Sequence, residues 1–266
     1  MFSTLMLAAA LVAGQDVAGL QLSNIRMTIG ELGPTRKSDK LLPGDLLYIG
    51  YDIDGLTIEA DGTAKYTMAM EVTDSAAKLI FKQDASELVD FVPLRGNKLP
   101  ARAFITIGLD QPPGAYSCKL TVTDSKTKST NSLTVKFEVL KPEFGIVAVS
   151  ASYDERAAIS APTTGVMGQT IFIQFGIATF QRDAKTKQPN VEVLYEVLDE
   201  KGTPTLGKPT KYIQDSGVDE KLGSFGMRFP LFMSRPGKFT VRLSATDKVS
   251  GKKATFEVPV TVLAAN

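Results

Sequence analysis

Pro-Gly-Ala-Tyr-Ser-Cys-Lys-Leu-Thr-Val-Thr-Asp occupies residues 113–124, and Pro-Gly-Lys-Phe-Thr-Val-Arg-Leu-Ser-Ala-Thr-Asp occupies residues 236–247. Each stretch opens on a Pro-Gly turn, continues with alternating apolar and polar residues, and ends on an aspartate. Alternation with a period of two is typical of a strand that buries one face. Gly114 corresponds to Gly237, an offset of 123 residues. A period this long indicates duplication of a whole domain rather than a solenoid repeat.

The repeat extends beyond this strand, with small changes of offset. A weaker match at an offset of 123 residues, in which only the spacing is kept, places Phe104 over Met227. Changes of one or two residues are what loop insertions and deletions produce in a common framework. The sequence therefore predicts two homologous domains in tandem. Three further pairs of segments match at offsets of 123 to 125 residues: 133–139 with 256–262, 44–51 with 168–175, and 70–74 with 195–199.

Alternation with a period of two recurs throughout both halves, and no segment shows a persuasive helical stripe. Near the end of the chain, for example, Phe239, Val241 and Leu243 alternate with polar residues. Residues 84–89 are compatible with a single turn of helix. About seven or eight short strands per domain, each with one polar face, predict an all-β fold of two antiparallel β-sandwiches.

The boundaries of the two domains follow from the repeat. We expect the first sandwich over residues 20–140 and the second over residues 144–263, with residues 141–143 as the linker. A linker of three residues that includes Pro142 leaves little freedom for a hinge. The sequence thus predicts a stiff, elongated rod whose halves fold separately when the chain is cut at Pro142.

The Pro-Gly run and the valine-rich final strand resemble the corresponding parts of bacterial immunoglobulin-like and fibronectin-III-like modules. Tyr116 and Cys118 also resemble the Tyr-x-Cys pair of true immunoglobulin domains, although the second copy has Phe239 and Val241 at these positions. The chain has no second cysteine and no tryptophan. The resemblance covers both domains and implies that the run is the penultimate strand, paired with the final one. Such modules serve adhesion, scaffolding, sugar binding and spacing, so the resemblance specifies the fold better than the function.

Residues 1–14 predict a signal peptide. Phe2–Gly14 is an apolar run rich in Leu and Ala, too short to span a bilayer and suited to a signal-peptide core. No Lys or Arg precedes the run, and an apolar N-terminal strand is the alternative. Cys118 is the single cysteine, so neither an internal disulfide nor a lipid-anchored cysteine after the run is expected. We expect a bacterial protein exported to the periplasm or the cell exterior, without a membrane span.

Composition and charge exclude several classes of function. The chain has 30 basic and 29 acidic residues, and this balance disfavours nucleic acid as the partner. It has no histidine, which removes the commonest general base and nearly all zinc sites. Cys118 alternates with Tyr116 and Leu120, so it is predicted to face the core rather than to act as a nucleophile. The sequence therefore predicts a protein that is not an enzyme and has no cofactor, with calcium as the exception considered next.

Four closely spaced carboxylates make residues 52–62 the best candidate for a ligand site. Carboxylates near glycine turns suit Ca²⁺, which binds hard oxygen ligands, although this spacing does not fit an EF-hand. Asp-Gly is also the standard signal of a hairpin turn, and that is the alternative. The second domain has Gly176 and Ala178 in place of the first pair, so a calcium site would belong to the first domain alone. The four residues are Asp52, Asp54, Glu59 and Asp61.

Two aspartates recur in both copies at the ends of strands. Asp74 corresponds to Asp199, and Asp124 corresponds to Asp247. An aspartate in this position commonly accepts hydrogen bonds from backbone groups two residues further on, which stabilises the turn. We therefore interpret all four as structural residues.

Together these features predict an exported, non-enzymatic structural or protein-binding module. Its partner would be an unknown protein or a component of the cell envelope. The alternative is a calcium-binding or glycan-binding module that uses the acidic residues 52–61. In the second domain, the loops at 181–190 and 199–217 are the longest and are expected to carry any loop contacts.

Overall fold

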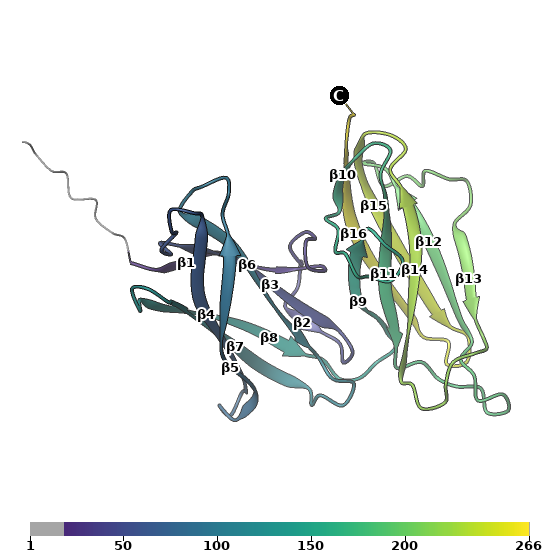
Figure 1. Cartoon of the computed structure of the whole chain (residues 1–266). Coiled ribbons are helices and arrows are strands. Elements are labelled where there is room, and N and C mark those ends of the chain that lie inside the picture. Colours follow the sequence, from purple (N-terminus) through teal and green to yellow (C-terminus); the bar gives the residue numbers. More distant parts are fainter. Residues whose placement is uncertain (1–18, 266) are drawn as a thin grey trace, which may run out of the picture.

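Sixteen strands, β1 to β16, form the regular structure of residues 19–265, the part of the chain that the structure describes (Figure 1). The structure is a computed structural model. The signal peptide predicted for residues 1–14 lies outside the described residues. None of the described residues is helical, and residues 84–89 belong to a strand rather than to the helical turn considered above.

The first eight strands form one β-sandwich and the last eight form another, which confirms the predicted all-β fold. A three-stranded sheet faces a five-stranded sheet in each sandwich, and the strand order of the second repeats that of the first. In the first sandwich the sheets are β1(Gln21–Thr28)-β3(Leu46–Asp54)-β6(Lys98–Thr106) and β2(Lys40–Leu41)-β8(Thr130–Val139)-β7(Gly114–Asp124)-β4(Thr63–Asp74)-β5(Leu79–Phe91). In the second they are β14(Ser224–Phe232)-β11(Thr170–Ala178)-β9(Gly145–Ser152) and β10(Thr164–Val166)-β16(Lys253–Leu263)-β15(Gly237–Asp247)-β12(Val191–Leu198)-β13(Thr210–Gln214).

The pairing departs from the antiparallel prediction at one short strand in each sandwich. Strand β2 pairs in parallel with β8, and β10 pairs in parallel with β16. In both cases the chain leaves the first strand of the small sheet and crosses to the large sheet, where it runs beside the last strand in the same direction. Strands of two and three residues carry too little sequence for their direction to be predicted from alternation.

The weak match between Phe104 and Met227 was in the wrong register. Phe104 pairs with Tyr48 on β3, whereas Pro230 pairs with Phe172, the counterpart of Tyr48, on β11. Phe104 therefore corresponds to Pro230 rather than to Met227. The additional residues lie in the long connections before β14, where the second domain departs most from the first.

The alternating residues form two separate cores, one inside each sandwich. On β3 the fully buried side chains are Leu47, Ile49, Tyr51 and Ile53, as the alternation predicts. Cys118 on β7 is buried in the same core, which confirms its predicted orientation. Burial raises the pKa of its thiol to about 12, so the thiol stays protonated and unreactive at neutral pH.

A thiol reagent is expected to label Cys118 only after a denaturant is added, because the folded protein shields the sulfur. Cys118→Val should cost less than about 1.5 kcal/mol of unfolding free energy, since valine has a similar volume and already stands at the equivalent buried position, Val241. Labelling kinetics and urea unfolding measure the two effects. Rapid labelling of the native protein would contradict the buried position.

The two sandwiches contact each other beyond their linker. Ile29, in the loop after β1, is only 7% exposed because it packs into the core of the second sandwich. The Asp45 carboxylate accepts a hydrogen bond from the Ala148 amide at 2.8 Å and binds the Arg36 guanidinium at 2.7 Å. Ala148 has a positive φ of 52° in a bulge of β9. These contacts fix the second sandwich against the loops of the first.

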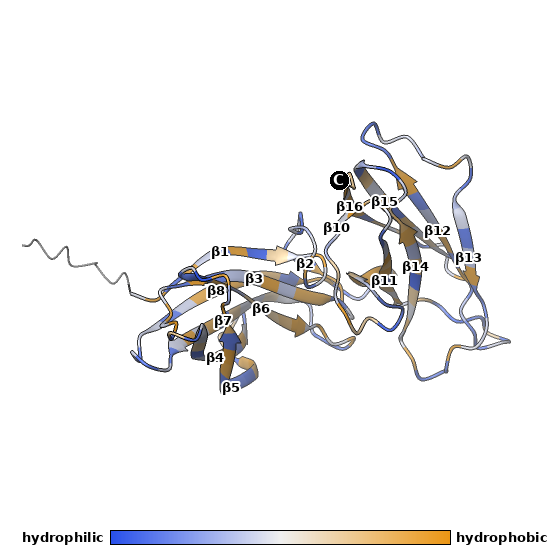
Figure 2. Ribbon diagram, turned by 45° about the horizontal axis from the view of Figure 1, so that its top comes forward, coloured by the Kyte–Doolittle hydropathy of each residue, from blue (hydrophilic) through white to orange (hydrophobic). Residues whose placement is uncertain are grey.

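The predicted elongated rod is wrong in shape. In Figure 2 the strands of the second sandwich run across the direction of those of the first, so the pair forms an L. The reason is that two loops of the first sandwich, one with Ile29 and one with Asp45, dock on the side of β9 rather than at the end of the second sandwich. A contact of this kind involves residues far apart in the sequence and leaves no periodic pattern.

Candidate functional site

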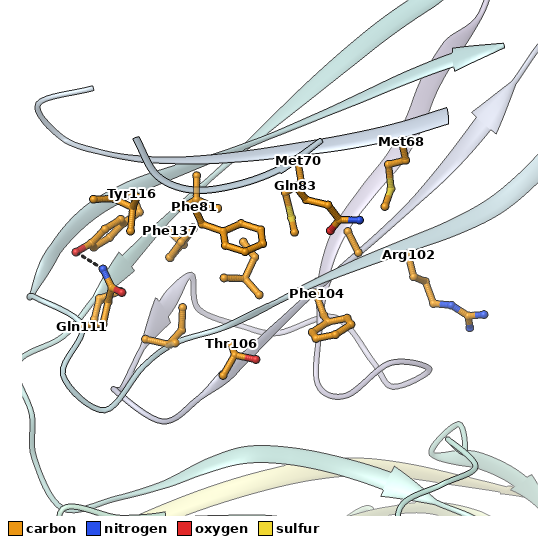
Figure 3. A pocket seen from close by; sticks show the side chains of 16 residues that line it. Met68, Met70, Phe81, Gln83, Arg102, Phe104, Thr106, Gln111, Tyr116 and Phe137 are labelled. Carbon is orange, nitrogen blue, oxygen red and sulfur yellow. Dashed lines mark hydrogen bonds between the residues drawn. The ribbon is translucent and has the colours of Figure 1, made fainter. Parts of the chain in front are cut away.

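The first sandwich is open along one side, between the edge strands β5 and β6. Strand β5 is the last strand of the large sheet and pairs only with β4, while β6 is the last strand of the small sheet and pairs only with β3. A cavity of about 520 Å³ lies between them, and Figure 3 shows its side chains. We call this cavity and its two edges the β5–β6 seam. Its wall is mainly apolar and includes Met68, Met70, Phe81, Ile105 and Tyr116.

The conformation of β5 brings its side chains to the seam. The strand has two register shifts against β4, one of them between Met68 and Met70. In the resulting register Phe81 lies opposite Val72 and Gln83 opposite Met70, so both side chains lie on the core-facing side. Phe81 nevertheless remains 47% exposed, because no strand covers the free edge.

Strand β6 contributes the opposite lip of the seam. Phe104 is 59% exposed, and its ring lies 6.0 Å from that of Tyr48. Arg102 stands further along the same strand and pairs with Glu31 at 3.3 Å. Phe104 alternates with Ala103 and Ile105, which face the core, so its ring lies on the outer face of the small sheet, outside the cavity.

The polar side chains of the seam are few: Gln83, Arg102, Thr106, Gln111 and Tyr116. The Tyr116 hydroxyl donates to the Pro112 carbonyl at 2.7 Å and accepts from the Gln111 side chain at 2.8 Å (Figure 3). Arg102 is held by its ion pair. In contrast, the backbone amides and carbonyls on the outer edge of β5 have no neighbouring strand among residues 19–265. The arrangement combines an apolar cavity with a row of backbone groups, which suits an extended chain.

Two of the predicted calcium ligands lie together on β3. Asp52 and Asp54 point to the outer face of the small sheet, since they alternate with the core residue Ile53. Lys98 stands within 3.7 Å of both carboxylates. Asp54 also accepts a hydrogen bond from Ser23 at 2.7 Å.

The other two predicted ligands lie elsewhere. Glu59 pairs with Lys126 at 3.0 Å. Asp61 accepts the Thr63 amide at 2.9 Å, and this hydrogen bond lowers the pKa of the Asp61 carboxyl. Within residues 19–265, no three acidic, cysteine or histidine side chains gather closely enough to hold a metal ion. Calcium binding by the four residues stays an alternative, which the following measurement decides.

Calcium at millimolar concentration is expected to leave the melting temperature unchanged, because Lys98 already faces the carboxylates of Asp52 and Asp54. Differential scanning calorimetry with calcium or with EDTA measures the difference. A rise of several degrees that disappears in Asp54→Ala would instead establish the calcium site, because a ligand that binds only the folded state stabilises it.

The recurrent aspartates at the ends of β7 and β15 close turns, as predicted. The Asp124 side chain accepts the amides of Thr57, Lys126 and Thr127 at 2.6 to 2.8 Å. Burial tends to raise the pKa of this carboxyl, but the hydrogen bonds outweigh it and lower the pKa. Asp247 accepts the amides of Gln181 and Val249 in the same way. These hydrogen bonds join a turn to a loop of the facing sheet, which is the structural role predicted for both residues.

The seam was not predicted from the sequence. The available signal was the apolar run at residues 79–81, together with Met68 and Met70 on one face of the preceding strand. The pattern of these residues indicates an ordinary half-buried hairpin. Their exposure depends on β5 and β6 ending their sheets side by side, which alternation within one strand cannot show.

Comparisons with known proteins add little to this description. No family model matches the chain, and no curated protein is similar enough to match. Among solved structures, the C-terminal domain of the Streptococcus agalactiae AgI/II polypeptide BspA is 9% identical with a TM-score of 0.30, over 91% of this chain and 100% of that one. Red sea bream transglutaminase is 13% identical with a TM-score of 0.29, over 94% of this chain. The chain spans 32% of the transglutaminase, and scores this low carry no argument about function.

One further finding concerns membranes. No helix within residues 19–265 is long and apolar enough to cross a bilayer.

Proposed function

We propose that the protein is an exported, non-enzymatic binding module of two immunoglobulin-like sandwiches, which holds an extended apolar segment of a partner protein in the β5–β6 seam. The observation that carries this proposal is the pairing of an apolar cavity with two free strand edges. An added strand would use the backbone groups of one edge for hydrogen bonds. Its alternate side chains would enter the cavity, and these side chains would supply the specificity.

The exposed Phe81 supports a protein segment as the ligand. Its side chain lies on the core-facing side of β5 and is still 47% exposed, so a strand added at this edge would cover the ring. Burial of apolar area contributes roughly 25 cal/mol per Å² removed from water, and aromatic side chains contribute large areas.

The absence of free acid–base groups at the seam supports a binding role rather than catalysis. The chain has no histidine, and among the described wall residues the Tyr116 hydroxyl and Gln111 amide are bonded to each other. Catalysis by proton transfer needs a group that is free to give or take a proton near the substrate. Export of the protein and the cell-envelope location of its partner remain parts of the proposal.

The proposal is tested by panning a random peptide library, displayed on phage, against the whole protein. Peptides that alternate apolar and polar residues should be enriched. Phe81→Glu should weaken their binding by tenfold or more, because it places a charge in the wall of the seam. The control is Phe232→Glu, which replaces another exposed phenylalanine, 60% exposed, on β14 of the second sandwich.

Amide shifts of the bound protein give an independent readout. Binding should perturb the backbone amides of β5 and β6 and leave those of β13 and β14 unchanged. If no peptide is enriched, or if Phe81→Glu and Phe232→Glu behave alike, the seam is not the binding site.

A further inference from the structure

The second sandwich repeats the turn by which the first sandwich docks. In the first sandwich this turn is residues 42–45, between β2 and β3, and its last residue contacts β9. The equivalent turn of the second sandwich is residues 166–169, from the end of β10 to β11. The third residue of each turn is a glycine with a positive φ, 92° at Gly44 and 95° at Gly168. Equivalent backbone hydrogen bonds of 2.9 to 3.1 Å hold both turns, so the two turns share one conformation.

The two turns differ in what covers them. Asp45 is 4% exposed, and its carboxylate accepts an amide of β9. In contrast, all four residues of the turn 166–169 are exposed, including the apolar Val166 and Met167, at 38% and 40%. Leu263, which pairs with Val166 near the C-terminus, is 51% exposed (Figure 1). The second sandwich thus leaves in solvent the docking surface that the first sandwich buries.

The other docking residue of the first sandwich is repeated as well. Ile29 follows β1 and packs into the core of the second sandwich. Tyr153 follows β9 in the same conformation: its amide donates to the Ile159 carbonyl at 2.9 Å, as the Ile29 amide donates to the Pro34 carbonyl at 2.9 Å. Ile29 is 7% exposed, whereas Tyr153 is 43% exposed. Tyr153 therefore adds a large, partly apolar side chain to the exposed docking surface.

The accepting surface is also present twice. On β9 it is the bulge at Ala148 and Val149, where the Ala148 amide donates to Asp45. Strand β1 has the same bulge at Asn24 and Ile25, and the φ of Asn24 is 49° where that of Ala148 is 52°. Val149 is 3% exposed in the core of the second sandwich, whereas Ile25 is 47% exposed. The first sandwich therefore exposes on β1 the surface that the second sandwich covers on β9.

We infer that the protein associates head to tail with a second copy of itself, and that the turn 166–169 and Tyr153 of one chain dock on the β1 bulge of the next. A second copy is favoured over another protein because the docking surface and the accepting surface are both exposed on the same chain. The contact between the two sandwiches already shows that surfaces of these two kinds fit. Because the contact joins two different surfaces, it repeats along a filament instead of closing into a two-fold dimer. This association does not depend on the function proposed for the β5–β6 seam.

The contact between chains should be weaker than the contact within the chain. Gln169 stands in place of Asp45, so an uncharged amide oxygen meets the bulge of β1 where a carboxylate meets that of β9. In addition, no linker raises the effective concentration of the two surfaces. We therefore expect reversible association that depends on protein concentration.

Sedimentation equilibrium of the whole protein, from micromolar to millimolar concentration, measures the association. The average mass should rise with concentration beyond that of a dimer, because each added chain exposes a new accepting surface. Met167→Glu places a charge on the docking surface and Ile25→Glu places one on the accepting surface, so each should weaken association by about tenfold or more. Ile213→Glu is the matched control, since Ile213 on β13 is 45% exposed, close to the 47% of Ile25, and belongs to neither surface.

Mixing the two variants tests the head-to-tail geometry. Met167→Glu keeps its accepting surface and Ile25→Glu keeps its docking surface, so the mixture should form a one-to-one complex and nothing larger. A two-fold dimer would not be restored in this way, because both of its halves use the same surface. Phe81→Glu, which alters the seam, should leave self-association unchanged, so this inference and the proposed function can fail separately.

Each of these substitutions changes an exposed side chain, and circular dichroism checks that the variants are folded. A constant monomer mass up to millimolar protein, a mass that stops at the dimer, or a mixture of the two variants that stays monomeric would each overturn the inference. Loss of association in Ile213→Glu would do the same, because that change touches neither surface.

Discussion

Asp45→Ala is expected to lower the free energy of unfolding by about 3–5 kcal/mol, because it leaves the Arg36 guanidinium buried without its partner. Both side chains of this ion pair are at least nine-tenths buried, so water cannot replace the lost carboxylate. The same substitution removes the acceptor of the Ala148 amide. The substitution therefore destabilises the contact between the sandwiches as well as the first sandwich itself.

Calorimetry and chemical denaturation measure both consequences. The intact chain should unfold in one transition, since the core of the second sandwich includes Ile29 of the first. In Asp45→Ala the transition should broaden or split. Glu138→Ala is the matched control: it breaks an exposed ion pair with Lys40 and should cost less than about 1 kcal/mol. A loss of similar size in both variants would contradict the role given to the buried pair.

Leu120→Ala and Leu243→Ala are each expected to cost about 2–5 kcal/mol, through lost apolar contacts and the cavity left behind. Leu120 lies at the centre of the first core and Leu243 at the centre of the second, and both are 0% exposed. The comparison tests the duplication, because equivalent positions should show similar losses in urea unfolding.

Lys119→Ala serves as the control for the leucine variants, since Lys119 neighbours Leu120 on the exposed face of the same strand. Lys119→Ala should change the free energy of unfolding by no more than about 0.5 kcal/mol. If either leucine variant loses less than about 1 kcal/mol of unfolding free energy, the strand register is wrong.

Cutting the chain at Pro142 tests the coupling in another way. The sequence alone predicted that each half would melt cooperatively by itself. In the structure the second sandwich depends on Ile29 to cover its core, so the isolated second half is expected to be less stable than it is within the intact chain. Equal melting of the free and the tethered second half would contradict this dependence.

The sequence predicted those parts of the fold that alternation determines. Leu120 and Leu243 could be assigned to the cores because each belongs to a strand with one polar face, and Cys118 could be assigned with them. The Asp-Gly turns were also predictable, since Gly55 and Gly62 have positive φ values of 82° and 88° that glycine adopts without strain. Local chemistry was sufficient in each case.

Other features depend on which strands become neighbours, and no local pattern carries that information. Asp52 and Asp54 were read as part of an acidic loop, but the alternation of Ile53 places them on a strand, opposite Lys98. The register of Phe104 was missed because only its spacing was repeated. The seam was missed for a related reason: its two lips belong to strands that never pair with each other.

The contact of Ile29 and Asp45 with the second sandwich has a consequence for any partner that contacts both sandwiches. Two sites joined by a flexible tether can adjust their separation, but here the separation is set by packed residues. The effective concentration of the second site is then high for a partner of matching span and near zero for any other. The L-shaped chain would thus favour partners whose two contact points match this fixed separation. Loosening the contact at Asp45 would let the protein bind partners of more varied span, but it would discriminate between them less.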